Sequence, residues 1–217
     1  MSQLTQRFQN IFQLQDHYFE IIGCGAIGSF TAMNLARAGA TNFSLWDPDT
    51  VDPVNIGVQH YDLTHIGNSK VKMLSKQMSA INPNVDITTH RQKFNSDTTT
   101  GYYRRSNNTS SDYRKRKTFF IIGIDNMAGR KQIVEDLICR CSSGRYWTRD
   151  QYMYNQTYVI DARMGSETFQ MYYWELIDKR AAINIARKKL AVEEIEQERI
   201  EYSYDSDSYG NCNDRIA

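Results

Sequence analysis

The chain of 217 residues has no marked excess of either charge, few cysteines and no long apolar segment. Its formal net charge of +1 gives no general reason to expect nucleic acid or an anionic membrane as a partner. No apolar run approaches the length that spans a bilayer, and the N-terminal segment MSQLTQRFQN lacks the apolar core of a signal peptide. These absences predict a cytoplasmic protein that binds neither nucleic acid nor membrane.

Cysteines are also too few and too irregularly placed for a disulfide framework in a chain of this length. A structural zinc site usually contains two closely spaced Cys or Cys/His pairs. One such pair is present, separated by a single residue, and no second pair exists, so we expect no zinc. The four cysteines are Cys24, Cys139, Cys141 and Cys212.

The residues that are present predict an α/β fold. Hydrophobic residues make up 41% of the chain and charged residues 24%, as in an ordinary globular protein. Short apolar segments alternate with segments of helical periodicity, which predicts a Rossmann-like, doubly wound, mostly parallel sheet flanked by helices. Alternating polarity near the C-terminal end adds antiparallel strands there. We expect strands at 17–22, 42–46, 85–89, 118–124, 157–160 and 167–174, and helices at 4–14, 26–38, 67–81, 127–139 and 179–201.

We expect residues 1–217 to form a single domain with one insertion and one tail. Residues 97–117 are rich in Thr, Ser and Asn and then in Arg and Lys, which indicates a solvated loop inserted between two strands. Binding of an acidic partner is the alternative role for this loop. The polar residues 202–217 are expected to be a loosely held tail.

A glycine motif of the form G-x-G-x-x-G lies where the first predicted strand runs into a predicted helix. Gly23 would make the tight turn, Gly25 would admit phosphates, and Gly28 would let the helix pack closely on the strand. Free amides at a helix N-terminus bind anions, and Asp47, at the end of the next strand, can accept hydrogen bonds from a ribose. The strand, glycine loop and helix, together with Asp47, predict a nucleotide site. A structural turn without a ligand is the alternative. The motif is Gly23-Cys24-Gly25-Ala26-Ile27-Gly28.

Further motifs follow the glycine loop in a characteristic order, over residues 21–94 and 118–130. This order resembles the ThiF-type family (ThiF, MoeB and HesA), which includes ubiquitin-activating enzymes and bacterial activators of sulfur-carrier proteins. The segment 160–174 also resembles the continuation in some bacterial and phage members. The motifs are Asp47-Pro48-Asp49-Thr50-Val51, Asn55, Gln59, Gly67, Lys70, Ile81-Asn82-Pro83, Asp125-Asn126 with Arg130, and Asp161-Ala162-Arg163-Met164.

The resemblance implies an adenylyltransferase that uses ATP and Mg²⁺. Family members adenylate the C-terminal carboxylate of a small ubiquitin-like or sulfur-carrier protein, commonly as homodimers. Carried over by residue, the resemblance makes Asp125 the magnesium ligand and Lys70 the cation at the phosphates. Judged alone, Lys70 would be an exposed surface lysine and Asp125 a helix cap. The remaining implied nucleotide contacts are Asp47 and Asp49 at the ribose, with Asn55 and Gln59 along the nucleotide and phosphates.

Two departures from the family pattern bear on activity. Val58 stands where the family usually has an arginine, which removes a cation expected near the triphosphate. Many members also have an arginine in the N-terminal helix that reaches the partner subunit's nucleotide, for which Arg7 is the candidate, although the alignment could instead place Asn10 there. These departures favour a second hypothesis, in which the chain is an impaired family member that serves as a dimerisation or scaffold subunit.

The resemblance also implies a second chemical step in ubiquitin-type members, which pass the adenylated carboxylate to a cysteine to form a thioester. Cys212 is the candidate, and an incidental thiol is an equal alternative because the nearby acidic residues would oppose its ionisation. A third hypothesis, from the glycine motif and Asp47 alone, is an NAD-dependent oxidoreductase. That hypothesis explains neither Lys70 nor Asp125.

Overall fold

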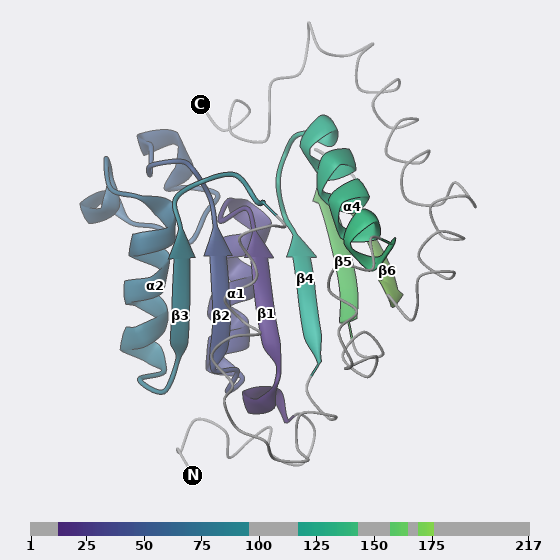
Figure 1. Ribbon diagram of the computed structural model, residues 1–217. Helices are drawn as coiled ribbons and strands as arrows, with labels where there is room; N and C mark the ends of the chain where they lie inside the picture. The colour runs from purple at the N-terminus through teal and green to yellow at the C-terminus, as the bar shows by residue number, and fades with distance from the viewer. Residues whose placement is uncertain (1–12, 96–116, 143–156, 165–168, 176–217) are drawn as a thin grey trace, which may run out of the picture.

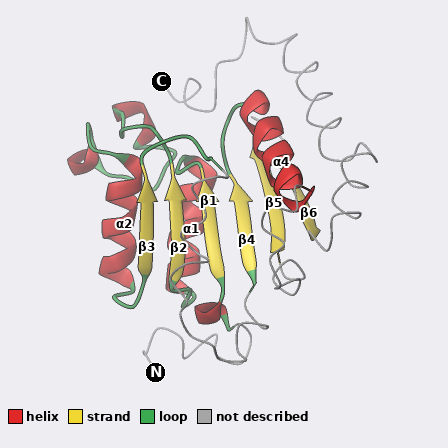
Figure 2. Ribbon diagram, viewed as in Figure 1, coloured by secondary structure: helices red, strands yellow, loops and turns green. Residues whose placement is uncertain are grey.

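The computed structural model describes residues 13–95, 117–142, 157–164 and 169–175 (Figure 1). They form a six-stranded sheet in the order β3-β2-β1-β4-β5-β6, with helices on both faces (Figure 2). The strands are β1 (Tyr18–Ile22), β2 (Asn42–Trp46), β3 (Asp86–His90), β4 (Thr118–Ile122), β5 (Thr157–Met164) and β6 (Phe169–Glu175), and the helices are α1 (Ala26–Arg37), α2 (Lys70–Ile81) and α4 (Met127–Ser142).

The order of the strands reverses at β1. This strand pairs in parallel with β2 on one side and with β4 on the other, and the sheet continues in parallel to β3 and β5. Only β6, paired with β5, is antiparallel among the described strands. Ile22 and Ile122, the last residues of β1 and β4, are register partners. Open α/β sheets bind ligands beyond the carboxyl ends of the strands at such a switch point.

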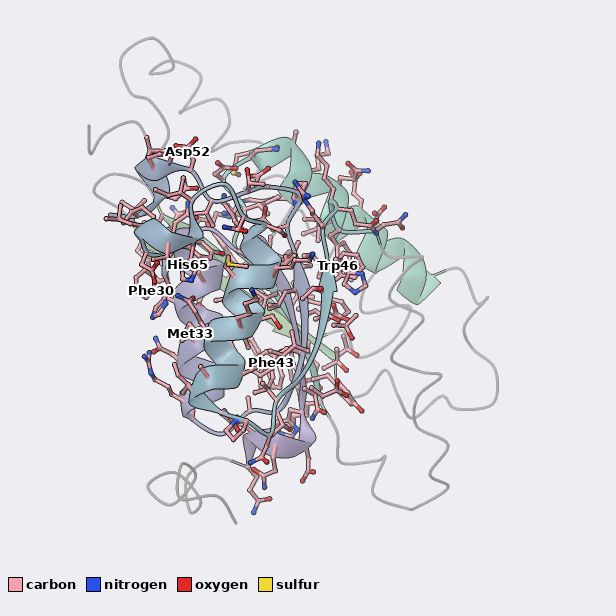
Figure 3. The ribbon with its side chains drawn as sticks, turned by 90° about the vertical axis from the view of Figure 1, so that its left-hand side faces the viewer. Phe30, Met33, Phe43, Trp46, Asp52 and His65 are labelled. Atoms are coloured by element: carbon pink, nitrogen blue, oxygen red, sulfur yellow. The ribbon has the colours of Figure 1, made fainter. Side chains whose placement is uncertain are left out.

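Side chains from β1, β2, β4 and β5 alternate between two apolar clusters, because successive residues of a strand point to opposite faces. Phe43 packs with Met33 of α1 and Leu74 of α2, whereas Trp46 packs with Val134 of α4. Figure 3, turned by 90° from Figure 1, shows Met33 and Phe43 on one side of the sheet and Trp46 on the other. Helices α1 and α2 therefore cover one face, and α4 covers part of the other.

The predicted fold class is confirmed, and most predicted elements lie within a few residues of the observed ones. The β2 prediction was correct at both ends, and the alternating segment does form an antiparallel strand, β6. The predicted helices 4–14 (apart from its last two residues) and 179–201, the loop 97–117 (apart from its last residue) and the tail 202–217 lie outside the described residues. Within the described residues, no helix has both the length and the apolar character needed to cross a bilayer.

Three predicted boundaries were wrong for identifiable reasons. Helix α2 begins at Lys70 and not at residue 67, because Gly67 has a φ of 78° and Ser69 forms an isolated bridge with Thr50. Strand β5 continues four residues beyond the prediction, to Met164, where buried ion pairs allow charged residues in the strand. At position 14 the chain forms a one-turn 3₁₀ helix, Leu14–Asp16, and not the end of an α-helix.

Candidate functional site

The glycine loop joins β1 to α1 in a tight turn at the switch point. Gly23 has a φ of 90°, which L side chains rarely adopt, and an added Cβ would lie 2.9 Å from the carbonyl oxygen of Gly123. At Gly28 the Cβ would lie only 1.8 Å from the carbonyl oxygen of Gly23. Both glycines are therefore required by the close packing of the loop, independently of any ligand.

Gly25 differs from the other two motif glycines, because it is not enclosed. The nearest atom to an added Cβ is Nε2 of Gln59, at 3.9 Å. Gly25 and the first two residues of α1, Ala26 and Ile27, are half-buried, whereas Gly28 is buried. The first amides of an α-helix have no partner within the helix, so this open side of the loop has the geometry of an anion site.

Asp47 connects the end of β2 to the glycine loop. Its Oδ2 accepts a hydrogen bond from the amide of Cys24 at 2.8 Å, and its Oδ1 accepts one from the amide of Asp49, also at 2.8 Å. Burial raises the pKa of the Asp47 carboxyl, while the Asp49 amide and the positive charge of Lys70 oppose that rise in pKa. Each carboxylate oxygen has a second lone pair, so the side chain retains capacity to accept a ribose hydroxyl.

Lys70 is buried beside this carboxylate, at the first position of α2. Its side chain is 8% exposed, and Nζ lies 3.4 Å from Oδ2 of the exposed Asp49. Its backbone amide also donates to the carbonyl of Asp49 at 3.0 Å. The alternative of an exposed surface lysine was wrong, because the isolated bridge between Thr50 and Ser69 brings the start of α2 against the end of β2.

The loop between β2 and α2 buries two of the polar residues that the resemblance singled out. Asn55 is 4% exposed and Gln59 is 5% exposed. The Oδ1 of Asn55 accepts the amide of Asp52 at 2.9 Å, which closes a capping box on the 3₁₀ helix Pro53–Asn55. Asn55 therefore has a structural role, and the nucleotide contact implied for it stays a prediction. Gln59 faces the open side of Gly25.

Tyr61 is a residue of this region that sequence reasoning missed. Its hydroxyl donates a hydrogen bond of 2.8 Å to the carbonyl of Cys24, within the glycine loop, and lies 3.5 Å from the carbonyl oxygen of Lys70. Burial raises the pKa of the Tyr61 phenol well above its ordinary value, so the hydroxyl remains a donor. No short motif marks this tyrosine, because its partner is 37 positions away in the chain.

Asp125 lies on the other side of the switch point, in the loop after β4. The amide of Gly123 donates to the carbonyl of Ile22 at 2.8 Å, and a Cβ at Gly123 would lie 3.2 Å from the backbone nitrogen of Gly28. The Asp125 loop thus packs directly against the glycine loop, and Asp125 itself is exposed. The side chain of Asn126 contacts the first turn of α4, by accepting the Gly129 amide at 2.7 Å.

Two buried arginines share the carboxylate of Asp161, an arrangement that sequence reasoning also missed. Arg130 of α4 donates to Oδ1 of Asp161, and Arg163 of β5 donates to Oδ2 from Nε at 2.9 Å and from Nη2 at 2.8 Å. All three residues are at most 6% exposed. Asp161 and Arg163 are two positions apart on one strand, and therefore on one face, which is the signal that could have indicated their pairing.

The cysteines and the N-terminal arginine are only partly covered by the described residues. Cys24 is fully buried, and burial raises its pKa well above the ordinary value for a thiol. A thiol of this kind is a poor nucleophile. Cys212, Arg7 and Asn10 lie outside the described residues, so the structure does not place the candidate for the thioester step.

Together these elements suit a polyphosphate with a cation. Helix-start amides, a buried lysine and a buried carboxylate surround the glycine loop, and an exposed carboxylate lies at the end of the adjacent strand. Within the described residues, no group of three or more His, Cys, Asp or Glu side chains could hold a metal by itself. Magnesium usually takes one or two carboxylates together with phosphates and water. Asp125 therefore fits a cation that arrives with a nucleotide.

Comparisons with known proteins identify the family of the chain. The ThiF family profile matches residues 6–164. Over 82 residues the chain is 34% identical to ubiquitin-like modifier-activating enzyme 5 of Drosophila persimilis, covering 38% of this chain and 21% of that protein. Over 91 residues it is 30% identical to tRNA threonylcarbamoyladenosine dehydratase of Bacillus subtilis (strain 168), covering 42% and 36%. The matches thus span at most about a third of these curated relatives.

The solved structure of E. coli MccB with succinimide has a similar fold. The TM-score is 0.54 at 16% sequence identity, over 75% of this chain and 42% of that one. At this identity the likeness concerns the fold alone. It supports the arrangement of sheet and helices around the switch point.

Proposed function

The chain belongs to the ThiF family, and from this premise we propose that it activates a carboxylate by adenylation with ATP. The substrate proposed is the C-terminal carboxylate of a small ubiquitin-like or sulfur-carrier protein. The observation that carries the proposal is the burial of Lys70 beside Asp47 and the glycine loop. A lysine kept out of water at a helix-start anion site has the chemistry of a phosphate ligand.

The reaction is an in-line displacement at the α-phosphate. A carboxylate oxygen of the substrate forms a bond to phosphorus, the bond from phosphorus to the oxygen bridging the α- and β-phosphates breaks, and pyrophosphate leaves with that electron pair. Negative charge on the phosphate oxygens must be stabilised in the transition state. Amides of Ala26 and Ile27 and the ammonium of Lys70 meet this requirement, while Asp47 and Asp49 orient the ribose.

Asp125 is proposed as the protein ligand of magnesium. Bound Mg²⁺ would offset charge on the phosphates and leaving group. Gln59 is proposed to contact the phosphates beside Gly25, and Asn55 to hold the loop that carries Gln59. The family's homodimer stays a prediction, as does a thioester on Cys212, which lies outside the described residues.

ATP binding, followed by calorimetry on the full chain, tests the site. Wild type should bind ATP more tightly with magnesium than without it, and Asp125→Ala should lose this gain. Pyrophosphate exchange dependent on added carrier protein would support adenylation. Exchange that persists in both Asp125→Ala and Lys70→Ala would reject the assigned roles. Tight binding of NADH without any binding of ATP would favour the oxidoreductase hypothesis.

A binding-only role is the second candidate function, and the observation that favours it is Val58. This half-buried residue immediately precedes the buried Gln59, where the family usually has a cation, so the phosphate region has one positive charge fewer. A subunit of this kind would bind ATP but show no exchange with any carrier protein. Restoring exchange by Val58→Arg would establish that the missing cation is the cause.

A further inference from the structure

One buried side chain connects three elements around the loop that carries Asp125. Arg130, in the first turn of α4, is 3% exposed. Its Nη2 donates to the carbonyl of Ile124, the residue immediately before Asp125. Its Nη1 donates to the carbonyl of Ala162 at 3.0 Å and to the carboxylate of Asp161, both in β5.

The loop that carries Asp125 is packed closely at both of its ends. Gly123 donates to Ile22 of β1 at 2.8 Å, and an added Cβ at Gly129 of α4 would lie 2.9 Å from Cδ1 of Ile124. Arg130 adds a side-chain contact to the middle of the loop, directly before the exposed carboxylate. The backbone at Asp125 is therefore held by β1, by α4 and, through Arg130, by β5.

The ion cluster around Asp161 fixes the orientation of the Arg130 guanidinium. Asp161 is fully buried, with Arg130 on Oδ1 and Arg163 on Oδ2. Buried ion pairs contribute little net stability in comparison with apolar residues of similar volume. A planar guanidinium with several fixed donors does, however, define a precise geometry for the groups that it binds. The ion cluster is therefore better suited to orienting the groups that bind the Arg130 guanidinium than to stabilising the fold.

We propose that Arg130 is a positioning residue for Asp125: it holds the Asp125 loop against β5, so that the carboxylate points to where the phosphates of a nucleotide would bring a magnesium ion. This inference rests on the proposed function, because it takes Asp125 as the magnesium ligand. Arg163 provides an internal control, since it shares Asp161 with Arg130 but is not bonded to Ile124.

The test compares Arg130→Lys with Arg163→Lys in the full chain. ATP affinity is measured by calorimetry in magnesium and again in EDTA, and the ratio of the two affinities is the magnesium-dependent gain. Arg130→Lys should reduce this gain about tenfold, as substitutions behind a metal ligand commonly do, and should leave affinity in EDTA unchanged. Arg163→Lys should leave both affinities at the wild-type values. Thermal unfolding of each variant measures stability separately.

A second pair, Arg130→Gln and Arg163→Gln, repeats the comparison with one arginine still paired to Asp161 in each variant. Equal gains in the Arg130 and Arg163 variants would overturn the positioning role. So would loss of cooperative unfolding in both Arg130 variants while both Arg163 variants fold, because Arg130 would then serve stability alone. Absence of a magnesium-dependent gain in wild type would overturn the proposed metal role of Asp125 and this inference with it. A wild-type gain that persists in Arg130 variants would overturn this inference alone.

Discussion

The Nζ of Lys70 lies 3.4 Å from Oδ2 of Asp49, and this pair joins a buried ammonium to an exposed carboxylate. The two residues are also linked through the backbone, because the amide of Lys70 donates to the carbonyl of Asp49. The ammonium is shielded from water, lies near the buried carboxylate of Asp47 and pairs with the solvated carboxylate of Asp49. An incoming phosphate would therefore find the ammonium already oriented and partly desolvated.

Replacing Lys70 by Met should weaken ATP binding while preserving the fold. The methionine keeps most of the buried aliphatic volume but removes the charge. We expect ATP affinity to fall about ten- to hundredfold, the loss expected when a hydrogen bond between charged groups is removed. Lys72→Met is the matched control, since Lys72 lies on the same helix and is exposed. Calorimetry checks this prediction, and equal affinity in the two variants would contradict it.

Substitutions of two motif glycines should affect stability and ATP binding separately. An added Cβ at Gly28 would collide with the Gly23 carbonyl at 1.8 Å, so Gly28→Ala should lower the free energy of unfolding by about 2 kcal/mol. Gly25→Ala has space for its Cβ and should change that free energy by less than about 1 kcal/mol. Its methyl group would nevertheless occupy the approach of the phosphates and abolish ATP binding. Urea unfolding and calorimetry on both variants measure the two effects. Normal ATP binding by a folded Gly25→Ala variant would show that the glycine loop is not part of the nucleotide site.

Asp161 should be among the most sensitive positions for stability. Asp161→Asn leaves the guanidiniums of Arg130 and Arg163 buried without an anion, and should lower the free energy of unfolding by about 3–5 kcal/mol. Glu135→Gln, an exposed change on α4, should alter it by less than about 0.5 kcal/mol. Urea unfolding of both variants provides the comparison. A small loss in Asp161→Asn would mean that water or a rearranged partner compensates the arginines.

Stability should also decrease in mild acid, in part through His90. The imidazole of His90 stacks on Trp46 with a ring distance of 3.6 Å, and burial lowers the pKa of His90. In the unfolded chain His90 has a pKa of about 6.5. As the pH falls from about 7 to 5, the unfolded chain therefore binds a proton at His90 more readily than the folded chain does. The free energy of unfolding decreases over this range for that reason. His90→Phe keeps an aromatic ring on Trp46 and should show a smaller decrease. Thermal unfolding at both pH values measures the difference, and His60→Phe serves as a histidine control.

Much of the fold could be predicted, because it depends on local patterns. Apolar runs marked the strands, and the turn residues between them marked most boundaries, as in β2. The boundary at Lys70 could not be predicted, since it depends on the bridge between Thr50 and Ser69. The length of β5 depended equally on a distant residue, because Arg130 neutralises a charge in the strand.

The sequence by itself determined the succession of strands and helices along the chain and the family. It also determined the glycine turn, with its required Gly23 and Gly28. Each of these features is encoded in residues close together in the chain. Tertiary structure alone decided that Lys70 is buried, that Tyr61 bonds the glycine loop and that Arg130 reaches Ile124 and Asp161. Such contacts join residues that folding brings together from separate elements. Their geometry depends on how the helices pack on the sheet, and no periodicity or spacing along the chain specifies it.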